Sequence, residues 1–187
     1  MLTGELVGLE ALVRWPTADP EHRSPAAFIP VAEMCGLIEP LGLWVLDEAC
    51  RRTAVWRRNG QMYGRVAVNL SCRQLNNPML ADQVEAALHR HGLPGRALEL
   101  EITESMVLEK GAIAFKNINA FAEMGIGLAI DDFGTGHSSL VNLKRLPLTR
   151  LKIDRSFVSG VGEDHDDAAI TAASIALAKQ LGLEVVA

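Results

Sequence analysis

Runs typical of buried strands alternate with runs typical of helices along this chain, and that alternation limits its fold more than any other feature. Strands are expected at residues 6–15, 65–71, 97–103, 126–132, 150–154 and 183–187. Helices are expected at residues 30–35, 41–59, 78–91, 112–124, 138–146 and 166–181. No hairpin signature such as Asn-Gly lies between two strand-like runs, so the strands are joined by helical crossovers. Crossovers imply parallel strands, in a sheet covered on both faces or in a closed barrel.

Composition narrows the class of protein further. The 187 residues are 49% hydrophobic, enough to bury the core of one soluble domain. The net charge is −5 and no basic block is present, which excludes a site for a DNA or RNA polymer of the usual basic kind. Three cysteines without CxxC spacing indicate reduced thiols in a cytoplasmic protein rather than a zinc site. No apolar run reaches the roughly eighteen residues that a membrane span requires.

Both ends of the chain look cut. A strand-like run begins directly at Glu5, and another stops at Ala187 without the polar turn that usually closes a strand. We therefore expect residues 1–187 to be a single domain that is incomplete at both ends, within a longer protein.

One polar residue lies among apolar neighbours in each of five expected strands: Glu10, Asn69, Glu101, Asp131 and Lys152. Burying a single unpaired carboxylate or ammonium costs several kcal/mol, so these side chains are expected to meet and compensate one another or a metal ion. The carboxyl ends of parallel strands offer such a meeting place, and barrel enzymes keep their chemistry there.

The residue types at this place indicate a hard cation. Asp131 and Asp132 end an apolar run and precede a turn with glycines at 134 and 136. Carboxylates and an Asn oxygen suit Mg²⁺ or Mn²⁺ rather than zinc. A shared aspartate can bridge two such ions, an arrangement that serves phosphodiester hydrolysis, and Lys152 beside it could orient the attacking water.

Each of these residues also has a purely structural interpretation. Glu10 could be a satisfied core acid, Asn69 a structural hydrogen-bonding residue, and Lys152 a buried partner of Asp131 or Asp154. Glu104 could start a helix or hold the nearby loop. The joint pattern favours a shared site over five separate explanations.

Five motifs resemble, in order, those of EAL domains, the bacterial phosphodiesterases of cyclic di-GMP. They are EALVRW at 10–15, VNLS at 68–71, EITES at 101–105, IDDFGTGHSSL at 130–140 and LKIDRSFV at 151–158. The resemblance implies an α/β fold, a (β/α)₈ TIM-like barrel of which about six β/α units are present here. It also implies hydrolysis of cyclic di-GMP to linear pGpG with Mg²⁺ or Mn²⁺, two ions in the complete domain.

Roles for individual residues follow from the same resemblance. It makes Glu10, Asn69, Glu101 and Asp131 metal ligands, with Asp131 bridging to a second ion that Asp132 also holds. Lys152 would position the nucleophilic water, and Glu104 would anchor the loop from 132 to 139. Leu12 and Arg14 would touch the substrate, and Asp154 would lie at the edge of the site.

The resemblance also has departures and open alternatives. His137 replaces the usual Tyr, and the family's next glutamate ligand and a glutamine motif would follow Ala187. The family's first strand and leading helix would precede Met1. The complete domain is expected to form a homodimer and to be fused to sensor or cyclase-like domains. The alternative is a non-catalytic cyclic di-GMP receptor, although such receptors usually lack carboxylates that are all present here, and the fragment itself could be inactive.

Overall fold

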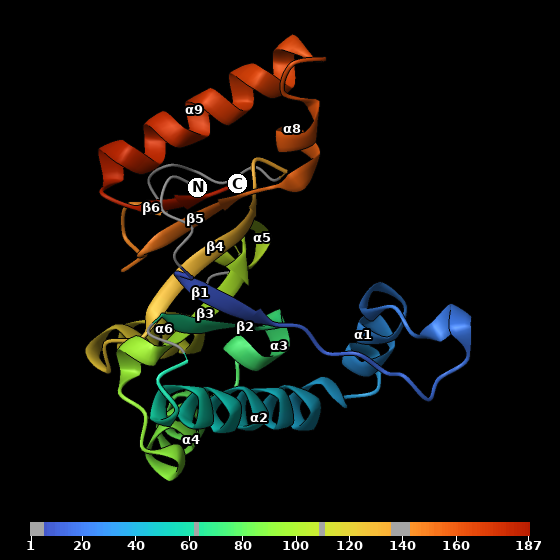
Figure 1. Ribbon diagram of the computed structural model, residues 1–187, viewed down its shortest axis with the longest axis vertical. Helices are drawn as coiled ribbons and strands as arrows, with labels where there is room; N and C mark the ends of the chain where they lie inside the picture. Colours follow the sequence, from blue (N-terminus) through green and yellow to red (C-terminus); the bar gives the residue numbers. More distant parts are fainter. Residues whose placement is uncertain (1–5, 62–63, 109–110, 136–142) are drawn as a thin grey trace.

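Six parallel strands form one sheet in the computed structural model, which describes residues 6–61, 64–108, 111–135 and 143–187 (Figure 1). The strands pair in sequence order, each with the next. They are β1 (Gly8–Ala11), β2 (Arg65–Asn69), β3 (Leu98–Thr103), β4 (Gly127–Phe133), β5 (Arg150–Ile153) and β6 (Glu184–Val186). The predicted strands and their parallel pairing are confirmed, although β1 is shorter than the run that predicted it.

Helices connect the strands and cover the outer face of the curved sheet. The longer ones are α1 (Pro25–Met34), α2 (Ile38–Arg58), α4 (Leu80–His91), α6 (Ala112–Glu123) and α9 (His165–Leu181). The shorter ones are α3 (Cys72–Leu75), α5 (Glu104–Leu108), α8 (Arg155–Gly160) and the 3-10 turns η1 (Pro20–His22) and η2 (Gly95–Ala97). The helix predicted over 138–146 lies mainly outside the described residues.

The start of α1 differs from the prediction. The helix begins at Pro25 rather than Pro30, and Pro30 lies inside it. Pro25 occupies the first turn, where a missing N–H costs nothing. Proline lacks the N–H that a hydrogen bond in the helix interior requires, so Pro30 was predicted to begin the helix. The structure instead places it in the interior.

The middle of the sheet forms the core. Leu98, Leu100 and Ile102 on β3 are buried, and so are Glu99 and Glu101 on the opposite face of the same strand. Successive side chains of β3 therefore point alternately to the outer face of the sheet, which packs against helices, and to the lumen of the barrel-like sheet. Glu99 is fully buried and is compensated by Arg65 Nη1 at 3.0 Å and Arg150 Nη1 at 2.6 Å. Without these partners, burial of that carboxylate would be strongly unfavourable.

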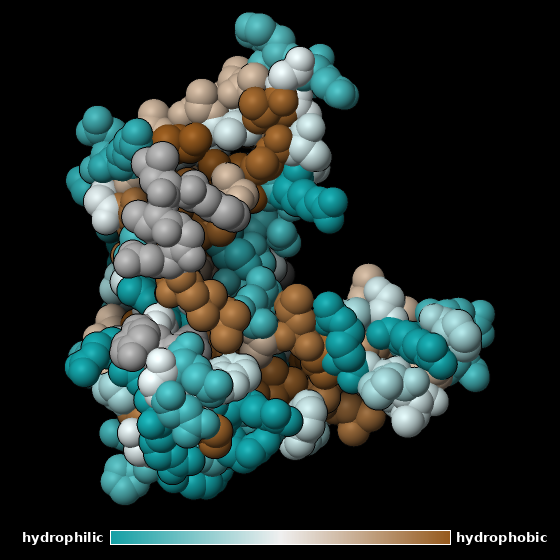
Figure 2. Space-filling model, in the orientation of Figure 1, coloured by the Kyte–Doolittle hydropathy of each residue, from teal (hydrophilic) through white to brown (hydrophobic). Residues whose placement is uncertain are grey.

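The helices leave one side of the molecule hollow. In Figure 1, α2 and α4 lie at one end of the sheet, α9 lies at the other, and α1 projects to the side. Figure 2 shows the surface hollowed between the region of α1 and that of α8, with hydrophilic residues deep inside. Within the described part of the chain, the helices are too short or too polar to cross a membrane.

Candidate functional site

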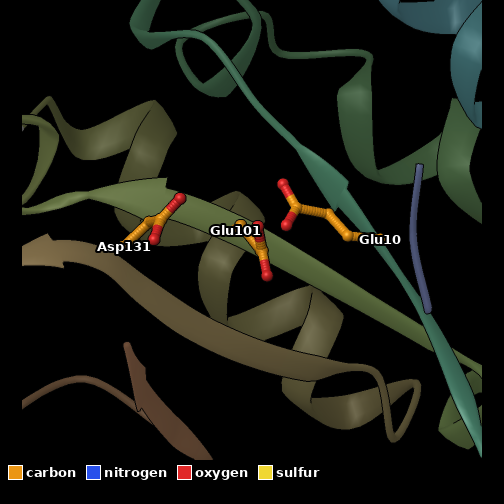
Figure 3. Close-up of side chains that lie close together, drawn as sticks. All are labelled: Glu10, Glu101 and Asp131. Carbon is orange, nitrogen blue, oxygen red and sulfur yellow. The ribbon is translucent and has the colours of Figure 1, made fainter. Parts of the chain in front are cut away.

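Three carboxylates meet at the carboxyl edge of the sheet. Glu10 of β1, Glu101 of β3 and Asp131 of β4 each place an oxygen within 4.8 Å of the other two (Figure 3). The parallel register produces this convergence. Glu101 pairs with Ala129, two residues before Asp131, and Glu10 pairs with Ala67, two residues before Asn69. Residues two apart on a strand share a face, so all these side chains point into the lumen.

Lys152 of β5 lies at the centre of this cluster. Its Nζ is 2.7 Å from Glu101, 3.2 Å from Asp131 and 3.4 Å from Glu10. Asn69 completes the group, because its Nδ2 donates to Glu10 Oε1 at 2.7 Å. The structure thus brings together the five strand residues that the sequence singled out, and three carboxylates surround a single ammonium.

The electrostatics of the cluster follow from this imbalance. Burial raises the pKa of Glu101 to about 7, although its hydrogen bond and charge interaction with Lys152 act in the opposite direction. Burial alone would lower the pKa of Lys152, but the hydrogen bond to Glu101 and the charges of Asp131 and Glu10 outweigh it and raise that pKa. Lys152 is therefore firmly protonated here, and the cluster retains excess negative charge.

The five residues differ in how deeply they are buried. Only Glu101 is fully buried, at 2% exposure, whereas the Glu10 side chain is 33% exposed and Asn69 is exposed. The reason is position along the strand. Glu10 lies on β1, the edge strand of the sheet, and Asn69 is the last residue of β2, whereas Glu101 lies inside β3, between β2 and β4.

A β-bulge presents Asp131 and Asp132. Ile130 pairs with Leu151, and the next pair is Phe133 with Ile153, so β4 holds one residue more than β5 in this interval. Asp132 has φ 55°, a left-handed conformation that is uncommon outside glycine. Thr135 closes the turn, donating from Oγ1 to the Asp132 carbonyl at 2.8 Å. Bulges next to active sites redirect side chains in this way.

Asp132 is not one of the three clustered carboxylates, and it interacts with Asp154. Burial, the charge of Asp131 and the hydrogen bond with Asp154 raise the pKa of Asp132. The hydrogen bonds from Ser156 lower the pKa of Asp154, which accepts from Ser156 N at 2.8 Å and so caps α8. The predicted pairing of Asp132 with Asp131 around a second ion stays a prediction.

Glu104 holds the turn that follows the aspartates. It is buried, and its Oε2 accepts a hydrogen bond from Gly134 N at 3.0 Å. Gly134 has φ 106°, a conformation that favours glycine. The contact agrees with the expected anchoring role. His137 and the rest of the loop to 139 lie outside the described residues.

A cavity of about 460 Å³ opens beside Asn69, a volume typical of small-molecule sites. Leu12 and Arg14, the residues expected to touch substrate, both line it. Ser71 and Gln74 line it too and form a capping box, in which Ser71 Oγ accepts from Gln74 N while Gln74 Oε1 accepts from Ser71 N. The sequence predictions did not include these two residues, although the Ser-x-x-Gln spacing is a recognisable signal.

The donors at this site fit a divalent hard cation. The three converging carboxylates supply only oxygens, the ligands that such ions prefer. Neither His nor Cys takes part in this cluster of described residues, so the donor set is not that of a structural zinc site. The excess negative charge around Lys152 favours a second cationic species beside it.

Known proteins share the sequence pattern of this chain. The EAL domain model matches residues 1–187. "Bifunctional diguanylate cyclase/cyclic di-GMP phosphodiesterase MucR" of Pseudomonas aeruginosa is 46% identical over 98% of this chain and 27% of MucR. "Oxygen sensor protein DosP" of Escherichia coli is 44% identical over 99% of this chain and 23% of DosP. The chain thus spans about a quarter of the length of these curated relatives.

Solved structures share the fold. "PaMucR Phosphodiesterase, c-di-GMP complex" has a TM-score of 0.91 at 45% identity, over 97% of this chain and 74% of that one. The EAL domain of Mycobacterium smegmatis DcpA has a TM-score of 0.83 at 38% identity, over 99% of this chain and 75% of that one. The predicted TIM-like α/β fold is confirmed, with six parallel strands present here. Family match, relatives and structures together show that this chain belongs to the EAL domain family.

Proposed function

We propose that the chain is the phosphodiesterase part of a protein that hydrolyses cyclic di-GMP to linear pGpG. The observation that carries the proposal is the meeting of Glu10, Glu101, Asp131 and Lys152 beside the cavity lined by Arg14. The names of MucR and of other relatives, including cyclic di-GMP phosphodiesterase NbdA of P. aeruginosa, support it. The PaMucR structure, described as a c-di-GMP complex, supports the substrate class.

The proposed cofactor is Mg²⁺ or Mn²⁺, with two ions in the complete domain. Glu10, Asn69, Glu101 and Asp131 would hold the first, and Asp131 and Asp132 would share the second. Because Asn69 Nδ2 donates to Glu10, its amide oxygen is the atom left for an ion. When bound, the metal would activate water and neutralise charge on the phosphate.

The residues of this chain then have distinct tasks. Lys152, held protonated by three carboxylates, donates a hydrogen bond that orients the attacking water. The water gives up a proton as its oxygen forms a new bond to phosphorus, one P–O ester bond breaks, and the leaving oxygen takes up a proton. Arg14 and Leu12 bind the dinucleotide at the cavity, with Arg14 supplying positive charge to a phosphate. Glu104 holds the turn after Asp132, and Asp154 lies at the edge of the site.

The relatives also suggest which other domains and partners accompany this site. The names of MucR and DosP indicate cyclase and sensor functions in longer proteins, so we propose that such domains accompany this one. A homodimer of the complete domain, a cytoplasmic location and the absence of any DNA or RNA polymer as partner belong to the same proposal.

A turnover assay tests the function. The protein that carries this chain is incubated with cyclic di-GMP and either Mn²⁺ or Mg²⁺, and linear pGpG is quantified by chromatography. Turnover that chelator abolishes and added metal restores is the expected result. Tight binding of cyclic di-GMP without product, measured by calorimetry, would instead identify the alternative, a receptor.

A further inference from the structure

Gly134, in the turn after the aspartates, is held from two sides. On one side Glu104 Oε2 accepts its N–H at 3.0 Å. On the other, the ring of Phe157 packs so closely that a Cβ at Gly134 would lie 2.9 Å from Cε2 of that ring. The same Cβ would lie 3.6 Å from Cγ2 of Ile170, on α9. Two elements distant in sequence, α5 and α8, therefore clamp one backbone position.

The clamped position lies directly after the bulge that carries Asp131 and Asp132. Gly134 has φ 106°, which glycine adopts readily, whereas Asp132, two residues earlier, has φ 55°, a conformation that other residues rarely adopt. Such a conformation persists only when its surroundings determine it. Thr135 bonds back to Asp132, so a shift of Gly134 is transmitted to the aspartates through this short turn.

The ring also connects two halves of the site. Phe157 lies on α8, which follows β5, the strand that carries Lys152. Asp154 joins the two elements, because its side chain caps α8 through Ser156 and its backbone N–H donates to the carbonyl of Phe133, at the end of β4, at 3.4 Å. Contact between Phe157 and Gly134 therefore fixes the end of β4 relative to the end of β5, and with it Asp131 relative to Lys152, whose charged atoms are 3.2 Å apart.

We propose that Phe157 is a positioning residue for the metal site, acting with Glu104 to fix the bulge that presents Asp131 and Asp132. The inference rests on the proposed function, since it assigns a role relative to the metal of that site. Phe157 packs against Gly134, so it acts on the site through the backbone of the turn that follows the bulge.

The affinity for Mn²⁺ distinguishes the two roles, because loss of a residue that only stabilises the fold would leave this affinity unchanged. Mn²⁺ is titrated into metal-free protein by calorimetry, for the wild type, Phe157→Ala, Phe157→Leu and Val158→Ala, and thermal unfolding is measured for each. Val158 is the matched control, because it is a partly buried apolar residue of the same helix that packs on the core. Phe157→Ala is expected to bind Mn²⁺ about tenfold more weakly, the usual effect of losing a support of a metal ligand.

The two further variants separate positioning from stability. Val158→Ala is expected to lower the unfolding temperature and keep wild-type affinity for Mn²⁺. Phe157→Leu, which retains apolar bulk against Gly134, is expected to recover most of the affinity. Unchanged affinity in Phe157→Ala, or equal weakening in Val158→Ala, would overturn the role of Phe157 and leave the proposed function standing. Failure of the wild type to bind Mn²⁺ would overturn both.

Discussion

At the scale of single residues, the site depends on charges that compensate one another. Glu101 is buried beside Lys152, and Lys152 also reaches Asp131 and Glu10. Removing one partner of a buried ion pair leaves the other uncompensated, which costs more than the pair itself contributes. Lys152 therefore has a role in stability as well as its proposed role in orienting water.

Lys152→Met is expected to lower the free energy of unfolding of the metal-free protein by about 2 kcal/mol, less than for a fully buried pair because solvent reaches the hollow. Urea denaturation measures this loss. Since a divalent cation can replace the lost positive charge, added Mn²⁺ is expected to restore much of the stability while turnover stays absent. Lys116→Met, at an exposed position of α6, is the control and should change neither property. A Lys152→Met variant with wild-type stability without metal would contradict the compensation argument.

At the scale of elements, side chains between neighbouring segments fix the walls of the site. In α2, Gly42 allows Gln74 to approach so closely that a Cβ at position 42 would lie 2.0 Å from Gln74 Nε2. Gln74 in turn closes the capping box of α3 next to the cavity. The glycine is thus explained by packing against the cavity wall rather than by the backbone conformation of α2.

Gly42→Ala tests that packing. Helix propensity alone would stabilise the variant by up to about 1 kcal/mol, but the overlap with Gln74 is expected to dominate and to destabilise it by about 1–3 kcal/mol. The Michaelis constant for cyclic di-GMP should rise, because the displaced Gln74 lines the cavity. In a double-mutant cycle with Gln74→Ala, the cost of Gly42→Ala should largely disappear. Additive effects in the cycle would show that the two residues do not meet.

The opposite edge of the sheet offers a test by pH. Glu184 forms a hydrogen bond and an ion pair with Arg150, and both lower the pKa of the Glu184 carboxyl group. The ionised carboxylate therefore stabilises the fold above its ordinary pKa of about 4.5. This stabilisation is lost as the pH falls through the lowered pKa of the folded state. Glu184→Gln is expected to be less stable than wild type at pH 7 by under about 1 kcal/mol, since the side chain is half exposed. The difference should shrink as the pH is lowered from 7 toward 3. Chemical denaturation at both pH values, with exposed Glu163→Gln as control, checks the sign; a difference that grows on acidification would contradict it.

The sequence predicted the strands that alternate with helices, and it missed the features that depend on contacts between residues far apart in the chain. Alternation located the six strands and the polar residue in each. The short helices α3, α5 and α8 have only four to six residues, too few for periodicity to identify them. The bulge between Ile130 and Phe133 and the contact of Phe157 with Gly134 arise from packing between β4, β5 and α8, which no local pattern records.

At the scale of the whole molecule, the two edges of the sheet have different functions, and β3 carries one glutamate at each. Glu99 and Glu101 lie two residues apart on the same face, yet Glu99 is neutralised by Arg65 and Arg150 while Glu101 joins the carboxylate cluster. This matches the division in barrel enzymes, whose chemistry lies at the carboxyl ends of strands and whose opposite edge serves stability. The expectation that residues 1–187 form one domain incomplete at both ends stays a prediction.

In the proposed function, this carboxylate cluster hydrolyses cyclic di-GMP with a metal ion. The most direct test is the rate of linear pGpG formation by the protein that carries this chain, with saturating Mn²⁺, for wild type, Glu10→Gln and Glu48→Gln. Glu48, which pairs with Arg51 on α2 and whose side chain is 32% exposed, close to the 33% of Glu10, is the matched control. We predict turnover by the wild type and the control and a loss of at least about 100-fold in Glu10→Gln, as expected when a metal ligand is removed. No product from the wild type, or full activity of Glu10→Gln, would contradict the claim.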